Sequence, residues 1–462
     1  MLSASLILRS ETGRSVSPLY CTIAPMPTRK IVFWGSAGLL GYTHLAYPVL
    51  LMALARVRDR AAATPGAPAR RPAAPAGVSN RTAGDPPALP ANQPPAAPAG
   101  APPDLPANQP AAGPAGPAGP AGPAGPARPA SEPSVSVIVA AYAEQDVIAG
   151  RIANLRALDY CSRRLELIVA CDGSPDATAP RARDAGADLV LELARGGKIR
   201  AQDAAVKRAQ NEIVAFSDAN VLWEPGALRA LVAPFGNPRV GYVCGDVRFF
   251  NDSGTNQEGV YWRYEMALRK LESRLRSVTA GNGAIYATRR EAYLVVDPAM
   301  GHDLSFPFNL VKRGWLALYA PDARANEKMV PTIEGEFARK RRMMSHGWRI
   351  VVRGGMLSPR GYDPLYALMI FSHRILRYLS PFLHLLALVA SAALLRRGTL
   401  YAVAVALQGA LLLGALAARA VPVRPLLIVR YYVLITASMA AGLWDWLRHG
   451  APVGWEPAEG TR

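Results

Sequence analysis

The chain has 462 residues, a formal net charge of +18 and a mean hydropathy of only +0.09, although half of its residues are hydrophobic. It also contains 41 prolines and 40 glycines, and one uniform soluble domain rarely combines such values. The averages therefore exclude a single soluble globule and indicate apolar segments, a Pro-rich insert and a folded region. No basic block interleaved with aromatic residues matches a nucleic-acid motif. We therefore expect membrane lipids and phosphate-bearing substrates, and no nucleic acid, as partners of the positive charge.

The amino-terminal region combines an irregular extension with one apolar segment. Residues 1–28 show no clear periodicity and no convincing cleavage pattern, so we expect a disordered extension and a true start near Met26. Ile31–Ala55 carries no formal charge over 25 residues, which is enough for a transmembrane helix, and we place that helix at residues 29–58. Basic residues are slightly more numerous after this helix than before it, which predicts that the following region faces the cytoplasm.

Residues 59–133 form a low-complexity segment. It holds 21 of the 41 prolines between Pro65 and Pro133, including a sixteen-residue repeat and five consecutive Gly-Pro-Ala triplets. Such a composition cannot bury enough apolar surface to fold, and it predicts a disordered, semi-extended linker. We expect no catalytic residues in this segment.

Strands alternate with helices from residue 134 onwards. Short apolar or β-branched runs predict strands at Val135–Ala141, Leu165–Cys171, Asp188–Leu193 and Glu212–Ser217. Alternation of this kind is typical of βαβ units and predicts an α/β domain over residues 134–360 with a mostly parallel sheet. Ligands of such sheets bind beyond the carboxyl ends of the strands, so the residues that follow these strands are the first candidates for a site.

Acidic motifs follow three of these strands. They read Ala141-Tyr142-Ala143-Glu144, then Asp172-Gly-Ser-Pro-Asp-Ala-Thr178, and then Asp218-Ala-Asn220. A carboxylate pocket beside a phosphate ligand needs a cation, and a hard divalent ion bound by Asp218 meets that need. Arg195-Gly-Gly-Lys198 adds a positive phosphate contact. Each motif alone is weak, since a DGS sequence is an ordinary turn, but their order at strand ends indicates a site for a nucleotide diphosphate.

In this order the motifs resemble those of the family 2 glycosyltransferases with a GT-A fold, in particular the membrane-anchored bacterial branch. The resemblance covers about Lys30–Arg58 and Ser134–Arg462, and it includes Tyr42–Leu51, Ala280–Arg290 and the tail Trp455–Arg462. It implies that a nucleotide-sugar donor is bound by Ala141, Tyr142, Glu144, Asp172, Lys198 and Asp218. It also implies a cofactor, Mg²⁺ or Mn²⁺, held by Asp218 with Asn220 beside it.

The resemblance further implies a general base just before an apolar helix. The acid pair of the family reads His302-Asp303 here, and Asp303 is the candidate base, with a helix N-cap as the alternative role. The implied contacts to the acceptor are Gly281, Asn282, Gly283, His302, Arg339 and Arg342. For the two arginines, a solvated basic face at the membrane is an equally good interpretation.

Some residues depart from the family pattern. Ala143 and Asp203 stand where Asn is usual, His302 replaces an acid, and Cys171 and Pro175 are unusual neighbours of the DGS motif. A histidine at position 302 could titrate near neutral pH and modulate Asp303, although such residues are more often simple donors. These departures bear on donor specificity and, to a lesser degree, on activity.

The carboxyl-terminal third is apolar again. Residues 361–379 predict an interfacial helix with His373, Arg374 and Arg377 on one side. Residues 380–447 predict two or three further transmembrane helices, at Tyr378–Leu395 with a breaking Pro381, at Gly398–Ala418, and at Pro425–Trp444 with Arg430. Residues 448–462 form a tail, whose side of the membrane depends on the number of spans.

These observations predict an inverting glycosyltransferase in the plasma (inner) membrane, multi-pass, with a cytoplasmic catalytic domain. It would move a sugar from a nucleotide-diphosphate donor to a lipid-linked or cell-envelope polysaccharide acceptor. One alternative is a processive polysaccharide synthase, which the missing QxxRW motif disfavours, and another is a weakly active or inactive homologue that binds nucleotide as a scaffold. A nicotinamide dehydrogenase is disfavoured because no GxGxxG follows Val135–Ala141. The four cysteines form no CxxC pair and predict reduced thiols.

Overall fold

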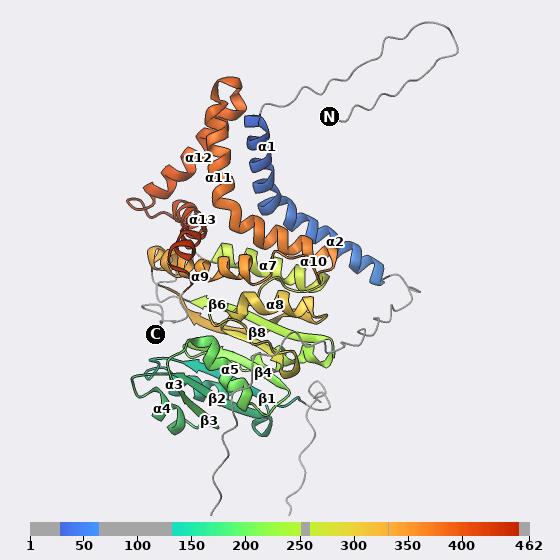
Figure 1. Cartoon of the computed structure of the whole chain (residues 1–462), viewed down its shortest axis with the longest axis vertical. Helices are drawn as coiled ribbons and strands as arrows, with labels where there is room; N and C mark the ends of the chain where they lie inside the picture. Colours follow the sequence, from blue (N-terminus) through green and yellow to red (C-terminus); the bar gives the residue numbers. More distant parts are fainter. Residues whose placement is uncertain (1–27, 64–131, 251–258, 331, 452–462) are drawn as a thin grey trace, which may run out of the picture. The chain divides into compact units, whose positions relative to one another are not determined.

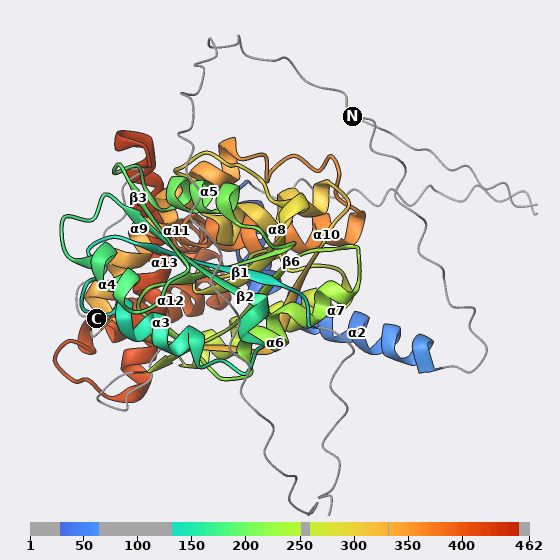
Figure 2. The same cartoon turned by 90° about the horizontal axis from the view of Figure 1, so that it is seen from below.

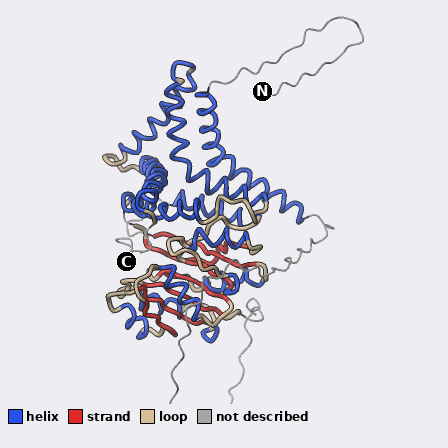
Figure 3. The backbone as a smooth tube through the Cα atoms, in the orientation of Figure 1, coloured by secondary structure: helices blue, strands red, loops and turns tan. Residues whose placement is uncertain are grey.

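The computed structural model describes residues 28–63, 132–250, 259–330 and 332–451. The expected amino-terminal extension, most of the Pro-rich linker, Cys21 and the tail Trp455–Arg462 lie outside these residues. Figure 1 shows a domain that contains the strands, with long helices extending away from one side of it. Figure 3 separates the strands of this domain from the purely helical part by colour.

An eight-stranded sheet runs through the domain in the order β3-β2-β1-β4-β7-β6-β8-β5. Its strands are β1 (Val135–Ala141), β2 (Leu165–Asp172), β3 (Leu189–Leu193), β4 (Ile213–Asp218), β5 (Val221–Trp223), β6 (Val240–Phe250), β7 (Ile285–Arg289) and β8 (Leu316–Lys328). The first four strands in this order are parallel, and β6 also pairs in parallel with β8. The predicted α/β fold with a mostly parallel sheet is therefore confirmed. The antiparallel pairs β4–β7, β6–β7 and β5–β8 were not predicted.

The register of the parallel strands brings the predicted motifs to one edge of the sheet. Ala141 at the end of β1 lies opposite Cys171 of β2, and Ala140 lies opposite Asp218 of β4. The residues that follow these strands therefore start from the same edge, as parallel pairing requires.

Helices cover both faces of the sheet (Figure 2). They are α3 (Ile148–Arg156), α4 (Thr178–Asp184), α5 (Lys198–Arg208), α6 (Ala227–Val232), α7 (Gly259–Leu275), α8 (His302–Lys312) and α9 (Ile333–Arg353). Along β1, Val137 and Val139 belong to the core under α3 and α6, whereas Ile138 belongs to the core under α5 and α8. Because successive strand side chains point to opposite faces, a strand buried on both sides is apolar throughout. Within the described residues, the buried Cys171 and Cys244 are free thiols.

Among the described residues, four helices are long and apolar enough to cross a membrane. The first comprises α1 (Thr28–Gly41), a π-helical turn at Tyr42–Ala46, and α2 (Tyr47–Ala63). The second comprises α10 (Pro364–Met369), a π-helical turn at Ile370–Ile375, and α11 (Leu376–Ala393). The others are α12 (Thr399–Ala417) and α13 (Arg424–His449).

The predicted break between an interfacial helix and a following span is wrong. Pro381 lies inside α11, and the helix continues without interruption from Pro364 to Ala393. A proline removes one backbone donor, but tertiary packing can hold the helix through it. Here buried side chains on both sides of Pro381, such as Tyr378 and Leu383, fix α11 against its neighbours.

The last described helix, α13, packs directly against α9 of the α/β domain. A Cβ atom added at Gly442 would lie 2.6 Å from the Cβ of Met344 and 2.8 Å from the carbonyl oxygen of Arg341, so only glycine fits there. The Trp348 indole donates a hydrogen bond to the carbonyl oxygen of Met439 at 2.8 Å, and Arg341 forms an ion pair with Asp445. These contacts join the domain to a helix that can cross the membrane.

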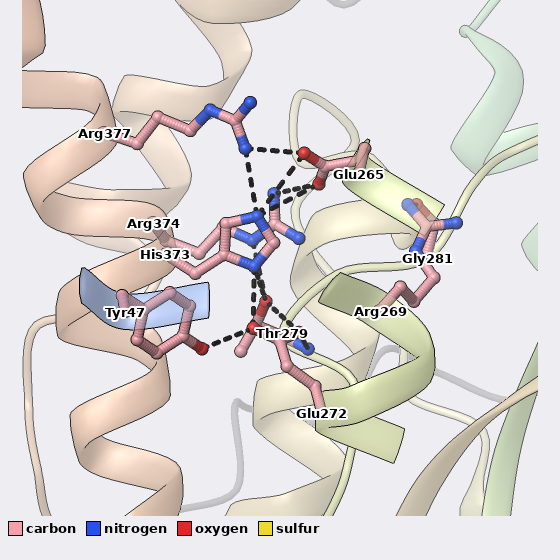
Figure 4. A network of polar contacts seen from close by, with 9 residues as sticks. All are labelled: Tyr47, Glu265, Arg269, Glu272, Thr279, Gly281, His373, Arg374 and Arg377. Carbon is pink, nitrogen blue, oxygen red and sulfur yellow. Dashed lines mark hydrogen bonds and ion pairs between the residues drawn. The ribbon is translucent and has the colours of Figure 1, made fainter. Parts of the chain in front are cut away.

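A buried polar network joins α7 to two of the helices that are long and apolar enough to cross a membrane (Figure 4). Glu272 is fully buried and accepts hydrogen bonds from the Tyr47 hydroxyl and the Thr279 hydroxyl, both at 2.9 Å, and contacts His373. His373, Arg374 and Arg377, predicted on one side of an interfacial helix, are therefore buried against α7 rather than placed at a lipid surface. The carboxylates of Glu265 and Glu272 contact these three side chains there, which explains why the side chains turn inward.

Replacing Glu272 with Ala should destabilise the protein by about 3–5 kcal/mol, because it leaves the buried His373 ring and the hydroxyl groups of Tyr47 and Thr279 without their acceptor. The thermal unfolding midpoint of the full chain in detergent would measure this loss. Exposed Glu291 in the matched variant Glu291→Ala serves as the control. Equal unfolding midpoints for the two variants would contradict a structural role of the network.

Candidate active site

A cavity of about 510 Å³ opens beyond the carboxyl ends of the central strands. Glu144, after β1, and Asp218, at the end of β4, line it together with Asp303 from the first turn of α8. The remaining lining includes residues of α7, α9, α11 and α13, among them Glu265, Arg269, Arg342, Arg374, Tyr378 and Met439. One cavity thus connects the edge of the sheet with helices that can cross a membrane.

Lys198 and Asp218 form an ion pair in this cavity. Lys198 is the first residue of α5, which begins after Gly197 with a φ of +94°, a backbone conformation that favours glycine. A Cβ atom at Gly283 would lie only 3.5 Å from the Lys198 Nζ atom, so the 281–283 loop passes close to the pair. The predicted phosphate contact and the predicted metal ligand are therefore neighbours, although 20 residues separate them in sequence.

Three of the residues predicted to bind the donor lie outside the lining of this cavity. Ala141, Tyr142 and Asp172 are not among the described residues that line this cavity. The Asp172 carboxylate is buried and accepts hydrogen bonds from the backbone N–H groups of Gly196, at 2.6 Å, and Gly197, at 2.9 Å. The Arg195 guanidinium lies 3.2 Å from the centre of the Tyr142 ring. In this structure Asp172 therefore shapes the Arg195–Lys198 loop, and its contact with a ribose or base stays a prediction.

The predicted metal ligands fit a divalent cation in their chemistry. Asp218 and Asn220 both line the cavity and offer oxygen atoms, which Mg²⁺ and Mn²⁺ prefer. Among the described residues, no three His, Cys, Asp or Glu side chains are grouped to hold an ion by themselves. Mg²⁺ in phosphate-binding sites is commonly held by one or two protein oxygens together with the phosphates of the substrate. Asp218 and Asn220 match that pattern.

Glu327 is an acidic residue of this cavity that sequence reasoning missed. It lies on β8 opposite Val221, which follows the Asp218–Asn220 motif directly. Burial raises the pKa of Glu327 to about 7. The positive charge of Arg339 acts to lower this pKa, and the Asp218 carboxylate acts to raise it. No local motif marks this residue, because pairing between β5 and β8 alone brings it to the site.

Asp303 does not cap α8. The N-cap is Gly301, and Asp303 lies in the first turn of the helix, so the alternative role as N-cap is wrong. A Cβ atom at Gly301 would lie 2.6 Å from the Asp303 Oδ1 atom, so the absence of a side chain at position 301 leaves room for this carboxylate. Asp303 is half-buried and lines the cavity, as a general base would.

His302 is buried in an aromatic cluster beside the cavity. Its Nδ1 atom lies 2.8 Å from the Tyr286 hydroxyl, and its ring stacks on Phe306 with centres 4.0 Å apart. Burial, aided by the positive charge of Lys198, lowers the pKa of His302 to about 3. The alternative that His302 titrates near neutral pH is therefore wrong, because burial disfavours the charged ring. Its Nε2 atom has no hydrogen-bond partner among the described residues.

The buried His302 should make stability depend on pH. In the unfolded chain a histidine binds a proton below about pH 6.5, whereas the folded chain resists this down to about pH 3. The contribution is fully present above pH 6.5 and is lost as pH falls, by about 2 kcal/mol at pH 5. The variant His302→Gln should therefore lose less thermal stability than the parent between pH 7 and pH 5. His449→Gln, which changes an exposed histidine, should behave like the parent, and a parental pH dependence in His302→Gln would contradict the assignment.

Contacts that the sequence does not reveal hold the loop 281–283 in place. A Cβ atom at Gly281 would lie 1.9 Å from the Tyr242 hydroxyl, so no larger residue fits. The Asn282 side chain donates to the carbonyl oxygen of Gly245 at 2.7 Å and accepts from the N–H of Ile285 at 2.9 Å. Both ends of this amide are engaged, and Asn282 therefore positions the loop.

The predicted acceptor arginines lie on α9. Arg339 and Arg342 both line the cavity, and Arg339 forms a two-pronged ion pair with Glu336, at 2.7 and 3.1 Å. Lys340 adds a second cation beside the same carboxylate at 3.4 Å. This side of α9 therefore borders the cavity, but Arg339 is half-buried and Arg342 is exposed, so contact with an acceptor stays a prediction for both residues.

Two of the departures from the family pattern have local explanations. Ala143 has a φ of +53°, and it is the only described residue other than glycine with a positive φ, a conformation that asparagine tolerates better. Asp203 accepts a hydrogen bond from the Tyr293 hydroxyl at 2.7 Å and does not line the cavity within the described region. The departure at position 203 therefore lies outside the site, whereas the one at 143 strains the backbone beside Glu144.

Comparison with known proteins agrees with this geometry. Residues 136–294 match Glycosyl transferase family 2. A mannosyltransferase from Pyrobaculum calidifontis, solved in complex with GDP-Man and Mn²⁺, shares the fold with a TM-score of 0.55 and 24% identity, covering 69% of this chain and 88% of that one. The chain thus carries a family 2 glycosyltransferase domain with a GT-A fold, as its motifs predict.

The curated relatives with named activities are bacterial. A poly-beta-1,6-N-acetyl-D-glucosamine synthase of Staphylococcus aureus (strain MSSA476) is 24% identical over 248 residues, which cover 51% of this chain and 60% of that protein. An N-acetylglucosaminyltransferase of Rhizobium sp. (strain N33) is 26% identical over 230 residues, which cover 45% of this chain and 51% of the relative. The chain therefore spans about half the length of the curated relatives it matches.

Proposed function

We propose that the chain transfers a sugar from a nucleotide-diphosphate donor to an acceptor hydroxyl, with inversion at the anomeric carbon. The observation that carries the proposal is one cavity that holds a phosphate-binding lysine, a metal-type carboxylate and a separate carboxylate on α8. The match of residues 136–294 to family 2 supports the same reaction class.

The reaction assigns one role to each of three side chains. Asp303 takes the proton of the acceptor hydroxyl, whose oxygen then attacks the anomeric carbon from the face opposite the diphosphate. Lys198 stabilises the charge that develops on the departing diphosphate, and such electrostatic stabilisation is commonly the largest catalytic contribution. A divalent ion held by Asp218 and Asn220 would neutralise the same diphosphate oxygens. The structurally similar mannosyltransferase was solved with Mn²⁺ bound, which supports this cofactor.

We place the enzyme in the plasma (inner) membrane with the domain on the cytoplasmic side, where nucleotide sugars are made. Four candidate membrane helices and the positive residues after the first of them support this orientation. The acceptor in this proposal is a lipid-linked or cell-envelope glycan. Contact of the cavity with α11 and α13 supports an acceptor delivered from the membrane.

A processive polysaccharide synthase is the second candidate. Similarity to the Staphylococcus aureus synthase supports it, and the missing QxxRW motif weighs against it. A scaffold that only binds nucleotide is the third, and the strained Ala143 is its main support.

One assay separates these candidates. The full chain in detergent is incubated with Mn²⁺ and a panel of nucleotide sugars that includes UDP-N-acetylglucosamine and GDP-mannose, and nucleotide release and product length are measured. Metal-dependent release with single-sugar products supports the proposal, and long products support the synthase. Nucleotide binding without release from any donor would overturn the catalytic proposal in favour of a scaffold.

A further inference from the structure

Three arginines of the polar network in Figure 4 also line the cavity. Arg269 comes from α7, whereas Arg374 and Arg377 come from the helix that continues as α11. Their side chains are buried, with only 3%, 7% and 6% of their surface exposed. The sugar-transfer roles assigned above use none of them.

The carboxylates nearby do not satisfy all of these guanidinium groups. The Glu265 carboxylate accepts hydrogen bonds from Arg377 at 2.5 Å and from Arg374 at 3.4 Å. Arg374 also donates a hydrogen bond from Nε to the Thr279 hydroxyl at 2.9 Å. Arg269 donates to the carbonyl oxygen of Gly281 at 3.0 Å. Within the described residues, one terminal nitrogen of Arg374 and two nitrogens of Arg269, Nε and a terminal one, have no hydrogen-bond partner.

Nearby carboxylates offset the charge of these arginines. Arg374 and Arg377 interact with the Glu265 carboxylate, whereas Arg269 interacts with the Asp246 carboxylate without a hydrogen bond to it. Burial acts to raise the pKa of Glu265, but Arg377 and His373 outweigh it and hold that pKa well below its usual range. The unpaired guanidinium donors would be costly if nothing else occupied this part of the cavity.

The lining beside these arginines is apolar. Tyr378 of α11 and Ile435 and Met439 of α13 line the same cavity, and both helices are long and apolar enough to cross a membrane. A ligand that satisfies this region therefore combines an anionic head with an apolar tail. A soluble phosphate or a nucleotide would leave the apolar lining uncovered.

We propose that Arg269 and Arg374, supported by Arg377, bind the phosphate of a membrane-embedded phosphorylated lipid that serves as the acceptor or carries it. This inference rests on the proposed function, because it names the substrate class of the same cavity. Guanidinium groups suit a phosphate, since they offer several donors in one plane.

Binding to the full chain in lipid nanodiscs tests the inference without any sugar donor. The probes are undecaprenyl phosphate, undecaprenol as the uncharged match, and inorganic phosphate. The parent chain should bind the phosphorylated lipid more tightly than the alcohol, and Arg269→Gln and Arg374→Gln should each weaken that binding about tenfold or more. Arg374→Lys, which keeps the charge, should recover part of the affinity. Arg289→Gln alters a buried arginine outside the cavity lining within the described region, and it should bind like the parent.

The possible results separate the lipid assignment from the catalytic proposal. Equal binding of undecaprenyl phosphate and undecaprenol by the parent chain would overturn the inference, even if the variants fail to fold. Inorganic phosphate that binds with the same affinity and the same dependence on both arginines would show that the site takes a free phosphate, which overturns the lipid assignment. Lipid-phosphate binding without sugar transfer would overturn the proposed function alone. Transfer to acceptors that lack a phosphate, at equal rates, would overturn the inference alone.

Discussion

Replacing Asp303 with Asn should lower the rate of sugar transfer by about 10²–10⁴-fold and leave nucleotide binding unchanged. The amide keeps the size of the side chain in the first turn of α8 but cannot accept the proton of the acceptor hydroxyl. Single-turnover measurements with saturating donor would isolate this step from binding. The affinity for the nucleotide diphosphate, measured separately, would show that the cavity is intact.

Asp297→Asn provides the matched control for this experiment. Asp297 precedes the same helix and forms an ion pair with Arg349 at 2.5 Å, yet it is not among the described residues that line the cavity. This variant should keep the parental rate. Turnover of Asp303→Asn at the parental rate would show that another group is the base, and Glu327 would then be the first residue to substitute.

Replacing Asp218 with Asn should lower the transfer rate by about 10²–10³-fold. The change removes the only carboxylate of the Asp218–Asn220 motif and takes away the ion-pair partner of Lys198. We also expect weaker Mn²⁺ binding, measured by the paramagnetic resonance of Mn²⁺ in the presence of a nucleoside diphosphate. This second measurement does not depend on turnover, and it therefore distinguishes a metal ligand from a residue that merely positions Lys198.

Asp203→Asn is the control for the charge change at position 218. Asp203 lies on α5 close in sequence to Lys198, but its carboxylate accepts a hydrogen bond from Tyr293 rather than lining the cavity. Metal binding and rate should stay near the parental values. An Asp218→Asn variant that binds Mn²⁺ as tightly as Asp203→Asn would contradict the assignment of Asp218 as a ligand.

The parts of the site that follow strands of the parallel sheet were predictable. Glu144, Lys198 and Asp218 stand near strand ends, and parallel pairing brings strand ends together whatever the details of packing. Apolar and β-branched runs predicted the first four strands to within one residue at each end. The family resemblance implied an acid just before a helix, and Asp303 instead lies in the first turn of that helix.

The remaining site residues come from pairings that no local pattern records. Glu327 reaches the cavity only because β8 pairs with β5, and Arg269 only because α7 packs on the membrane helices. Asp172 has the predicted sequence context but is engaged by the backbone of the Arg195–Lys198 loop. Pro381 failed as a helix breaker, since packing on neighbouring helices outweighed the missing backbone donor.

The contact of Gly442 with α9 has a consequence for which acceptors can react. With no room for a side chain between the two helices, the catalytic domain cannot tilt away from α13 without breaking the Trp348 and Arg341 contacts as well. If α13 crosses the membrane as proposed, Asp303 would therefore stand at a fixed height above the membrane surface. A hydroxyl held too close to its lipid anchor, or too far from it, would miss that height, so the length of an anchored acceptor itself becomes a criterion of selection.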